Sequence, residues 1–168
     1  MKAEQLKQVQ APLKQRYKDE PDAATITLSA RGQVGEGITC KVDTGKAIAE
    51  AGLHPATGGD GTSLCSGDML LEALVACAGV TLSAVATAIG VDLKDATVIA
   101  EGELDFRGTL AVTKEAPVGF KSLRLEFELD TDASSEQVES LIKLTERYCV
   151  VYQTLLNTPE IVVVHSTA

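Results

Sequence analysis

Alternation of apolar and charged residues is the strongest pattern in the chain, and it falls at residues 120–130. In FKSLRLEFELD, every second residue from Leu123 to Leu129 is apolar, and the residues between them are charged. Because side chains alternate across a strand, this pattern predicts an antiparallel strand with one buried and one solvated face. Residues 24–31 alternate in the same way. Together with the glycines that follow and the apolar residues 38–42, they predict a β-hairpin.

Three further short apolar stretches predict the remaining strands. Residues 97–106 and 109–113 are expected to form two strands that join near Arg107 and Gly108. Residues 161–165, IVVVH, are expected to form a last strand that closes the chain.

The longest apolar stretch predicts a central helix. From Met69 to Ile89 the only charged residue is Glu72, which is the pattern of a helix buried on most sides. Gly90 is expected to end this helix, and Ser66 is expected to cap its beginning.

A second, amphipathic helix is expected to begin at Ser134 or Ser135. Ser134 and Gln137 have the spacing of a capping box. Apolar residues at helical spacing then continue past Cys149 to Leu155, so the helix is expected to run through Cys149 without a break.

Two shorter helices are expected in the first third of the chain. Residues 2–18 have helical character, with a break expected at Pro12. Residues 46–51 are expected to form a short helix that ends at Gly52. The stretch 54–68 is rich in Gly, Ser, Thr and Asp, which predicts a loop leading into the apolar helix.

The order of these elements predicts one α+β domain over residues 1–168, with residues 1–20 as a helical extension. In this fold an antiparallel sheet packs against a long buried central helix. The chain has 3 Tyr, 3 Phe and no Trp, so aliphatic residues must build the core. One chain of this composition is not expected to cover a helix this apolar, which favours a partner subunit.

Charge and targeting signals narrow the possible functions. The net charge of −9 repels the phosphate backbone, so no nucleic-acid partner is expected. The first residues have no apolar signal-peptide region, which predicts a cytoplasmic location. The apolar stretch 69–89 is long enough to span a bilayer. It has neither basic flanks nor an aromatic belt, so a buried helix is favoured and no membrane contact is expected.

Four cysteines are the candidate reactive groups: Cys40, Cys65, Cys77 and Cys149. Persistent structural disulfides are not expected in a reducing compartment. No CxxC pair occurs and the two histidines are isolated, so no metal site is expected. Taken alone, each cysteine is more often a small buried residue than a catalyst. Packing is the simpler interpretation for Cys40 and Cys65, with a third redox thiol as the alternative for Cys65.

The surroundings of two cysteines resemble those of a known family. Cys77 stands in LCSGDMLLEALVACAGVTLSAVATAIGV, which resembles the first conserved helix of the OsmC/Ohr family (osmotically inducible protein C and organic hydroperoxide resistance proteins). Cys149 stands in LTERYCVVYQTL, which resembles the family's second cysteine site. The strand-like segments GELDFRGTL and GFKSLRLEFEL are also similar, and the resemblance covers roughly residues 24–165.

This resemblance implies a thiol-dependent peroxidase that acts on organic hydroperoxides. Cys77 would attack the peroxide as a thiolate, leaving an alcohol and a sulfenic acid. Cys149 would then form a disulfide with Cys77, and an external dithiol would reduce it. The resemblance also implies an OsmC-like fold, an intertwined homodimer with active sites at the interface, and no cofactor.

The sequence departs from the family in three places. Ser66, Gly67 and Asp68 stand where many members have Pro-Glu, and Val150 stands where proline commonly follows the second cysteine. The family's thiolate-pairing arginine has no clear counterpart. Arg31 is the candidate by elimination, and a solvated charge at the end of a strand is the simpler interpretation for it.

These departures keep an alternative function open, a non-catalytic dimer that binds a small apolar or oxidised ligand. On a straight helix, neither Asp68 nor Glu72 shares a face with Cys77, so neither acid is placed to act on its thiol. A purely structural or partner-binding role is a third hypothesis, and no residue specifically favours it.

Overall fold

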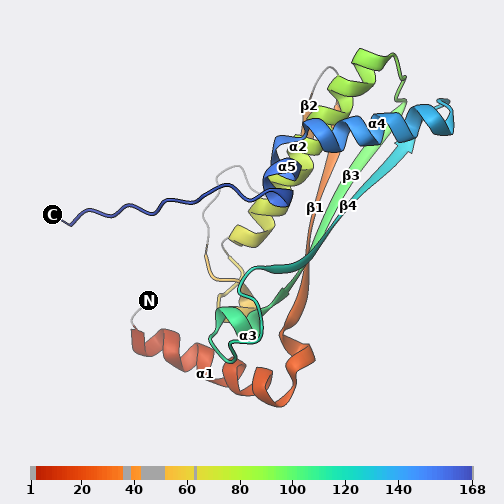
Figure 1. Ribbon diagram of the computed structural model, residues 1–168. Coiled ribbons are helices and arrows are strands. Elements are labelled where there is room, and N and C mark those ends of the chain that lie inside the picture. Colours follow the sequence, from red (N-terminus) through yellow and green to blue (C-terminus); the bar gives the residue numbers. More distant parts are fainter. Residues whose placement is uncertain (1–2, 36–38, 43–51, 63, 168) are drawn as a thin grey trace.

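The structure is a computed structural model that describes residues 3–35, 39–42, 52–62 and 64–167 (Figure 1). In chain order its elements are α1 (Ala3–Asp19), the 3-10 turn η1 (Pro21–Ala24), β1 (Thr25–Gly35), β2 (Thr39–Val42), the 3-10 turn η2 (Pro55–Thr57), α2 (Ser66–Ile89), β3 (Asp95–Asp105), α3 (Phe106–Thr109), β4 (Phe120–Asp130), α4 (Ser135–Tyr148) and α5 (Val150–Leu156).

The strands form one antiparallel sheet in the order β2-β1-β3-β4. The predicted hairpin is confirmed, because β1 pairs with β2 from Gly32 opposite Val42 to Gly35 opposite Thr39. The strand predicted at residues 120–130 is confirmed as β4. Together with the helices, this sheet confirms the α+β class.

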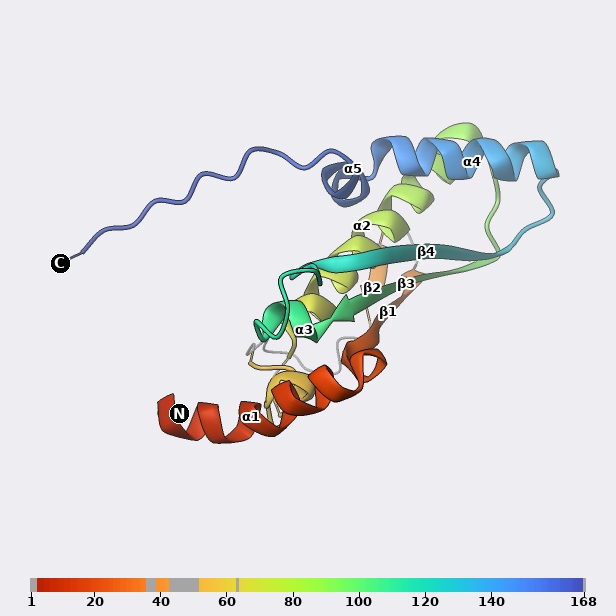
Figure 2. The ribbon, with the colours of Figure 1, turned by 60° about the horizontal axis from the view of Figure 1, so that its bottom comes forward.

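The helices α2 and α4 lie on one side of the sheet, and α2 crosses it diagonally (Figures 1 and 2). The core forms where α2 meets β3 and α4. Its fully buried side chains include Leu71, Val75, Ala78 and Leu82 of α2, Val98 and Ala100 of β3, and Leu141 of α4.

The expected ends of the long helices are largely observed. Gly90 ends α2 in the left-handed conformation, with φ 72°, which glycine adopts without steric cost. Ser134 and Gln137 form the predicted capping box at α4. Ser66 is not the cap of α2: it is the first helical residue, and Cys65 takes the cap position without a side-chain bond.

Among the described residues, α2 is the only helix long and apolar enough to cross a membrane. Its most apolar window has a mean hydropathy of 2.0, and 44% of that window is buried within the chain. The buried face lies against the sheet and α4. Within one chain α2 is therefore covered on one side only, whereas we expected a helix covered on most sides.

The extension α1 is tied to the domain by hydrogen bonds from Gln10 to the carbonyl of Thr57, at 3.2 Å, and from Tyr17. Tyr17 is buried, and its hydroxyl donates a 2.7 Å hydrogen bond to the carbonyl of Ala56. The helix runs from Ala3 to Asp19 without the break that we expected at Pro12. A proline removes one amide donor, and the remaining hydrogen bonds of the helix continue on both sides.

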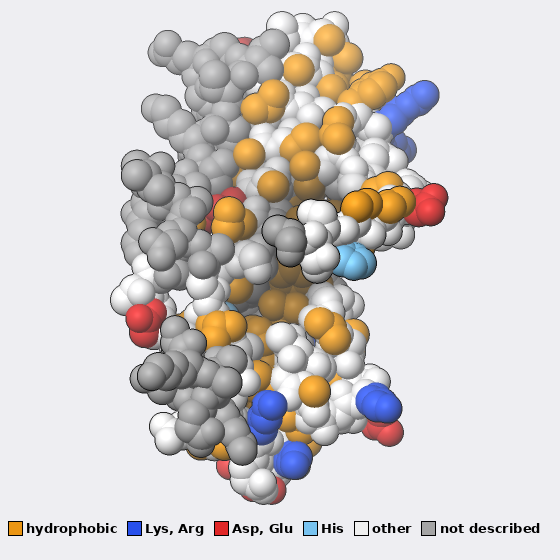
Figure 3. All heavy atoms as spheres, turned by 90° about the vertical axis from the view of Figure 1, so that its left-hand side faces the viewer, with side chains coloured by type: hydrophobic (Ala, Val, Ile, Leu, Met, Phe, Trp, Pro, Cys, Tyr) orange, Lys and Arg blue, Asp and Glu red, His pale blue; other side chains and the backbone are white. Residues whose placement is uncertain are grey.

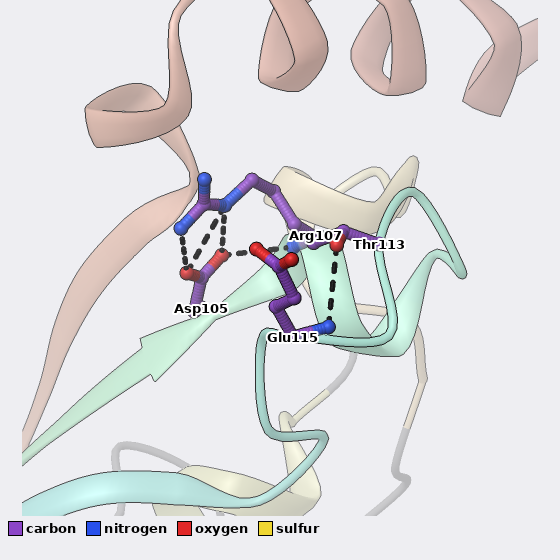
Figure 4. A network of polar contacts seen from close by, with 4 residues as sticks. All are labelled: Asp105, Arg107, Thr113 and Glu115. Carbon is purple, nitrogen blue, oxygen red and sulfur yellow. Dashed lines mark hydrogen bonds and ion pairs between the residues drawn. The ribbon is translucent and has the colours of Figure 1, made fainter.

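The strand expected at residues 109–113 is wrong. After β3 the chain makes the short helix α3, because Asp105 accepts hydrogen bonds from both the backbone and the side chain of Arg107 (Figure 4). Asp105 is buried, so this ion pair keeps its carboxylate satisfied. The following turn is stabilised by Thr113, whose hydroxyl accepts from the amide of Glu115 at 3.2 Å.

The strand expected at residues 161–165 is also absent from the single chain. These residues follow α5 as an extended segment that leaves the body of the protein (Figure 1). Ile161 is 81% exposed and Val164 is 86% exposed. A strand needs a neighbour for its backbone groups, and this segment has none among the residues that the structure describes. The helix expected at residues 46–51 lies outside the described residues.

Candidate functional site

Cys77 lies near the middle of α2, on the side that faces the junction of α4 and α5. It is half-buried and packs against the core. The apolar periodicity of the helix turns its neighbours Val75 and Ala78 inward, so Cys77 falls between the core face and the exposed Val80.

Cys149 is the residue at which the second helix is interrupted. Its φ of −71° and ψ of 109° are extended, so α4 ends at Tyr148 and α5 begins at Val150. The expectation of one continuous helix is wrong. The Cys149 amide still donates to the carbonyl of Thr145 at 2.9 Å, and its carbonyl accepts from Gln153 at 2.9 Å, so the backbone groups remain paired across the break. The break occurs although Val150 stands at the family's proline position.

The break brings the two cysteines together. The thiols of Cys77 and Cys149 meet at this break, and each shifts the pKa of the other. The backbone amides of Val150 and Val151 also act on the Cys77 sulfur, and they lower its pKa. These amides are free to do so because the first amides of a helix have no partner within it. Cys149 is only 1% exposed, so solvent reaches the pair from the Cys77 side.

These contacts move the pKa values of the two thiols in opposite directions. Burial raises the pKa of Cys77, but donors from Val151, Cys149, Val150 and the Thr81 side chain outweigh it and hold the pKa below its usual value. The pKa of Cys149 is raised to about 11, chiefly by burial and also by its contact with Cys77, although the amides of Tyr152 and Val151 lower it. Cys77 is thus favoured as a thiolate and Cys149 as a thiol.

The strongest influences on Cys77 include no charged side chain. Arg31 does not reach it within one chain. Its guanidinium lies 3.9 Å from Glu128, and it stands opposite Ile99 in the sheet, on the face turned away from α2. Within one chain Arg31 is therefore a solvated charge on the outer face of the sheet, as the simpler interpretation predicted.

The acidic residues at the beginning of α2 form a separate group. Burial raises the pKa of Asp68, which the charge of His54 partly offsets. Burial and the neighbouring Asp68 raise the pKa of Glu72. Neither acid is among the groups that act on Cys77, in agreement with their helical spacing.

An apolar cavity of about 480 Å³ lies one helical turn from the thiols. Leu74 precedes Cys77 by three residues and Tyr152 follows Cys149 by three, and both line this cavity. The opposite wall is the inward face of β4. The cavity is lined by Leu74, Phe120, Lys121, Ser122, Leu123, Leu125, Phe127, Glu146, Tyr152, Leu155 and Leu156.

A second cavity of about 400 Å³ meets the first at Phe120, which lines both. Cys65 and His54 lie on its wall, and the His54 ring stacks on Phe106 with centroids 5.1 Å apart. Cys65 precedes Cys77 by about three helical turns, or roughly 18 Å along the axis. It is therefore not placed to compete with Cys149 as a partner of Cys77.

The other predicted residues lie away from the thiol pair. Cys40 lies in β2 opposite Val34, and its side chain is outside the described part of the structure. His54 occupies the turn expected for His54-Pro55, where its Nδ1 accepts from the amide of Ala56 at 3.0 Å. Within the described ranges, no three His, Cys, Asp or Glu residues are grouped so that they could hold a metal ion.

Two features of the site were missed from the sequence. The amides of Val150 and Val151 depend on the break at Cys149, which the apolar spacing did not indicate. The Thr81 hydroxyl could have been found, because Thr81 follows Cys77 by four residues on a predicted helix, and residues at that spacing share a face.

Comparisons with known proteins agree with this arrangement. The sequence model of the family described as OsmC-like protein matches residues 59–164, which contain both thiols of the pair. A comparison with curated protein sequences gives no match.

Solved structures share the fold at low sequence identity. An OsmC-like hydroperoxide resistance protein from Jannaschia sp. CCS1 superposes with a TM-score of 0.62 at 21% identity, over 86% of this chain and 97% of that one. An OsmC-like protein from Mycoplasma pneumoniae gives a TM-score of 0.55 at 15% identity, over 80% of this chain and 86% of the other. Because the family model covers more than half of the sequence, and the fold is that of solved OsmC-like proteins, this chain belongs to the OsmC-like protein family.

Proposed function

We propose that this protein is a thiol-dependent peroxidase that reduces organic hydroperoxides, with Cys77 as nucleophile and Cys149 as resolving thiol. The observation that carries the proposal is the contact between two free thiols whose pKa values are shifted in opposite directions. Two groups of one kind with separated pKa values are a frequent basis for a division of chemical roles.

The chemistry proceeds in three balanced steps. The Cys77 thiolate attacks a peroxide oxygen, the O–O bond breaks, and the departing alkoxide takes a proton to become an alcohol, which leaves a sulfenic acid on Cys77. The Cys149 sulfur then attacks the Cys77 sulfur, the S–O bond breaks, and the Cys149 proton leaves with the hydroxide as water. An external dithiol reduces the resulting disulfide by exchange and becomes oxidised itself.

The apolar cavity favours organic hydroperoxides over hydrogen peroxide. Its walls are largely aliphatic and aromatic, and its volume of about 480 Å³ accommodates a substrate with an apolar substituent. The neighbour from Jannaschia sp. CCS1 is described as a hydroperoxide resistance protein, which supports the same reaction class.

The same cavity favours the second candidate function, in which the protein binds a small apolar or oxidised ligand without turning it over. In that case the thiols pack beside the ligand and stay reduced. The two functions differ in one property, the oxidation of Cys77 by hydroperoxide.

The homodimer is part of the proposal, and the exposed C-terminal segment supports it. Four consecutive apolar residues, Ile161 to Val164, are exposed in the single chain. Hydrophobic side chains are spread over the face from which this segment emerges, and they line a hollow beside it (Figure 3). A second copy has the same apolar face and the same segment, so the segment of each copy can cover the apolar face of the other.

We also propose a cytoplasmic location, which would keep Cys77 and Cys149 reduced between turnovers.

Mass mapping of peptides without reduction tests the proposed function. The reduced protein is treated with one equivalent of cumene hydroperoxide, and the disulfide between Cys77 and Cys149 is quantified together with the alcohol formed. We expect one disulfide for each alcohol. Cys77→Ser should abolish both products, and the matched variant Cys65→Ser should leave both unchanged. Free thiols after prolonged exposure, with saturable binding of the alcohol, would instead establish the ligand-binding function.

A further inference from the structure

The side chain of Phe120 is turned inward by an irregularity in β4. Glu103 of β3 stands opposite Ser122, but Leu104 stands opposite Phe120, so Lys121 is the extra residue of a β-bulge. In a regular strand Phe120 would share the outer, charged face of β4. The bulge instead places it opposite the buried Leu104, on the face that carries the apolar side chains.

The inward ring packs on a bare stretch of backbone in β3. A Cβ on Gly102 would lie 2.6 Å from the Cδ1 atom of Phe120 and 2.9 Å from the Cδ2 atom of Leu123, and both distances are shorter than van der Waals contact. A glycine inside a strand often marks such a close approach. Gly102 therefore forms the seat on which the Phe120 ring lies against the sheet.

Two apolar cavities lie on either side of this ring. Phe120 lines both the cavity of about 480 Å³ beside the thiols and the cavity of about 400 Å³ that contains Cys65. Of the two cavities, Leu74 lines only the first and Leu70 only the second. These two leucines are one turn apart on α2 and share a helix face, so the second cavity continues the first along α2.

We propose that Phe120 is the partition between two chambers of one ligand site, and that its ring limits the length of the apolar substituent on the hydroperoxide. The inference rests on the proposed function for the nature of the ligand. It assigns a role to the second cavity, which the thiol chemistry does not use.

The ring separates the chambers because of its size and its seat. While the ring lies on Gly102, an apolar substituent that enters beside Leu74 is confined to the first cavity. The second cavity is nearly as large, and it offers a longer substituent further apolar surface. Its apolar walls include Leu53, Leu70, Leu104, Phe106 and Val118. A smaller side chain in place of Phe120 therefore joins the two cavities.

The test measures how the affinity for straight-chain primary alcohols, from butanol to dodecanol, depends on their length. These alcohols are the products of alkyl hydroperoxides, and isothermal titration calorimetry on the reduced full-length protein measures their binding without turnover. Each buried methylene strengthens binding about fourfold, so we expect the affinity of the parent to rise with length and to level off when the first cavity is full. In Phe120→Ala the affinity should keep rising about fourfold per methylene beyond that length.

Two further variants distinguish joined cavities from a single enlarged one. Phe120→Ala/Leu70→Trp fills the second cavity from α2, so its affinities should level off at a shorter length than those of Phe120→Ala. Leu129→Ala shortens a side chain on the same face of β4, outside both cavities, and should level off where the parent does. If circular dichroism shows that Phe120→Ala does not fold, Phe120→Leu should give a smaller extension of the series.

Affinities in Phe120→Ala that level off at the same length as in the parent would overturn the inference. An extension that Leu70→Trp leaves intact would also overturn it, and so would a lack of measurable binding in both proteins. Alcohol binding needs no hydroperoxide, so its result is independent of the test of function. Hydroperoxide consumption that requires Cys77, with no extension in Phe120→Ala, would leave the peroxidase standing and remove the partition.

Discussion

The thiols of Cys149 and Cys77 meet across the junction of α4 and α5, where each shifts the pKa of the other. This contact depends on one interrupted helix. Had α4 continued through Cys149, the amides of Val150 and Val151 would have been used within the helix, and the Cys77 sulfur would lack two of its donors. The backbone break therefore both places the second thiol and leaves two amides that lower the pKa of the first.

The first prediction concerns the order in which the two thiols titrate. The pKa of Cys77 is held below its usual value, so its thiolate forms at a lower pH than that of an ordinary cysteine, and the pKa of Cys149 is raised to about 11. Since only the thiolate is alkylated, we expect Cys77 to reach half of its maximal rate several pH units below Cys149. Peptide mass spectrometry after pulses of iodoacetamide at increasing pH measures both. Equal midpoints would contradict the assignment of roles.

The second prediction isolates the sulfenic acid. With Cys149→Ser, no thiol remains in contact with Cys77, so oxidation should stop at the sulfenic acid. We expect dimedone to label Cys77 stoichiometrically in Cys149→Ser, and only weakly in the unmodified protein, where Cys149 competes for the sulfenic acid. Cys65→Ser is the matched control and should behave as the unmodified protein. Strong labelling in that control would mean that Cys65 is the resolving thiol.

Sequence patterns correctly predicted those elements that are determined by residues close together in the sequence. The alternation in β4 and the capping box at Ser134 are both decided within a few residues, and both are observed. The break at Cys149 could not be predicted in this way, because Tyr152 and Leu155 continue the apolar spacing of α4 beyond it. Spacing along the sequence likewise did not show that Cys77 and Cys149 touch. The resemblance suggested them as a pair, and the geometry places them together.

The prediction of a strand at residues 161–165 was wrong for a different reason. Its composition favours a strand, and its backbone is extended, but no strand in the described part of the chain lies beside it. A β-pattern predicts the conformation that a segment prefers. It does not predict which chain supplies the neighbour.

The third prediction concerns the cavity beside the thiols. Leu123 lies on the inward face of β4 and lines this cavity. Leu123→Gln keeps a similar shape and introduces a polar group, so we expect kcat/KM for cumene hydroperoxide to fall roughly tenfold and that for hydrogen peroxide to change little. Glu128→Gln, on the outer face of the same strand, is the control and should affect neither substrate. Equal losses for both peroxides in Leu123→Gln would show that the cavity does not select the substrate.

The fourth prediction concerns the close packing of Phe120 on Gly102. A Cβ on Gly102 would overlap the Phe120 ring and the Leu123 side chain, so the ring must move in Gly102→Ala. Overpacking of this kind costs about 1–3 kcal/mol, which urea denaturation can measure. The double variant Gly102→Ala/Phe120→Leu should recover part of the loss, because the smaller side chain makes room. A Gly102→Ala protein as stable as the parent would show that the ring moves freely between the two cavities.

The fifth prediction concerns the C-terminal segment and the second copy of the chain. Exposed, extended and apolar residues pair readily with another sheet, and here the segment and the apolar face belong to the same molecule. We expect light scattering to give twice the monomer mass of 17.6 kDa for the unmodified protein. Val162→Lys/Val164→Lys should shift this mass toward the monomer, because two charges would have to be buried. Ser166→Lys/Thr167→Lys adds the same charge just beyond the apolar run and should leave the dimer intact. A dimer that resists the first pair of substitutions would place the interface elsewhere, and a monomeric parent would leave the exposed face of α2 without a partner copy.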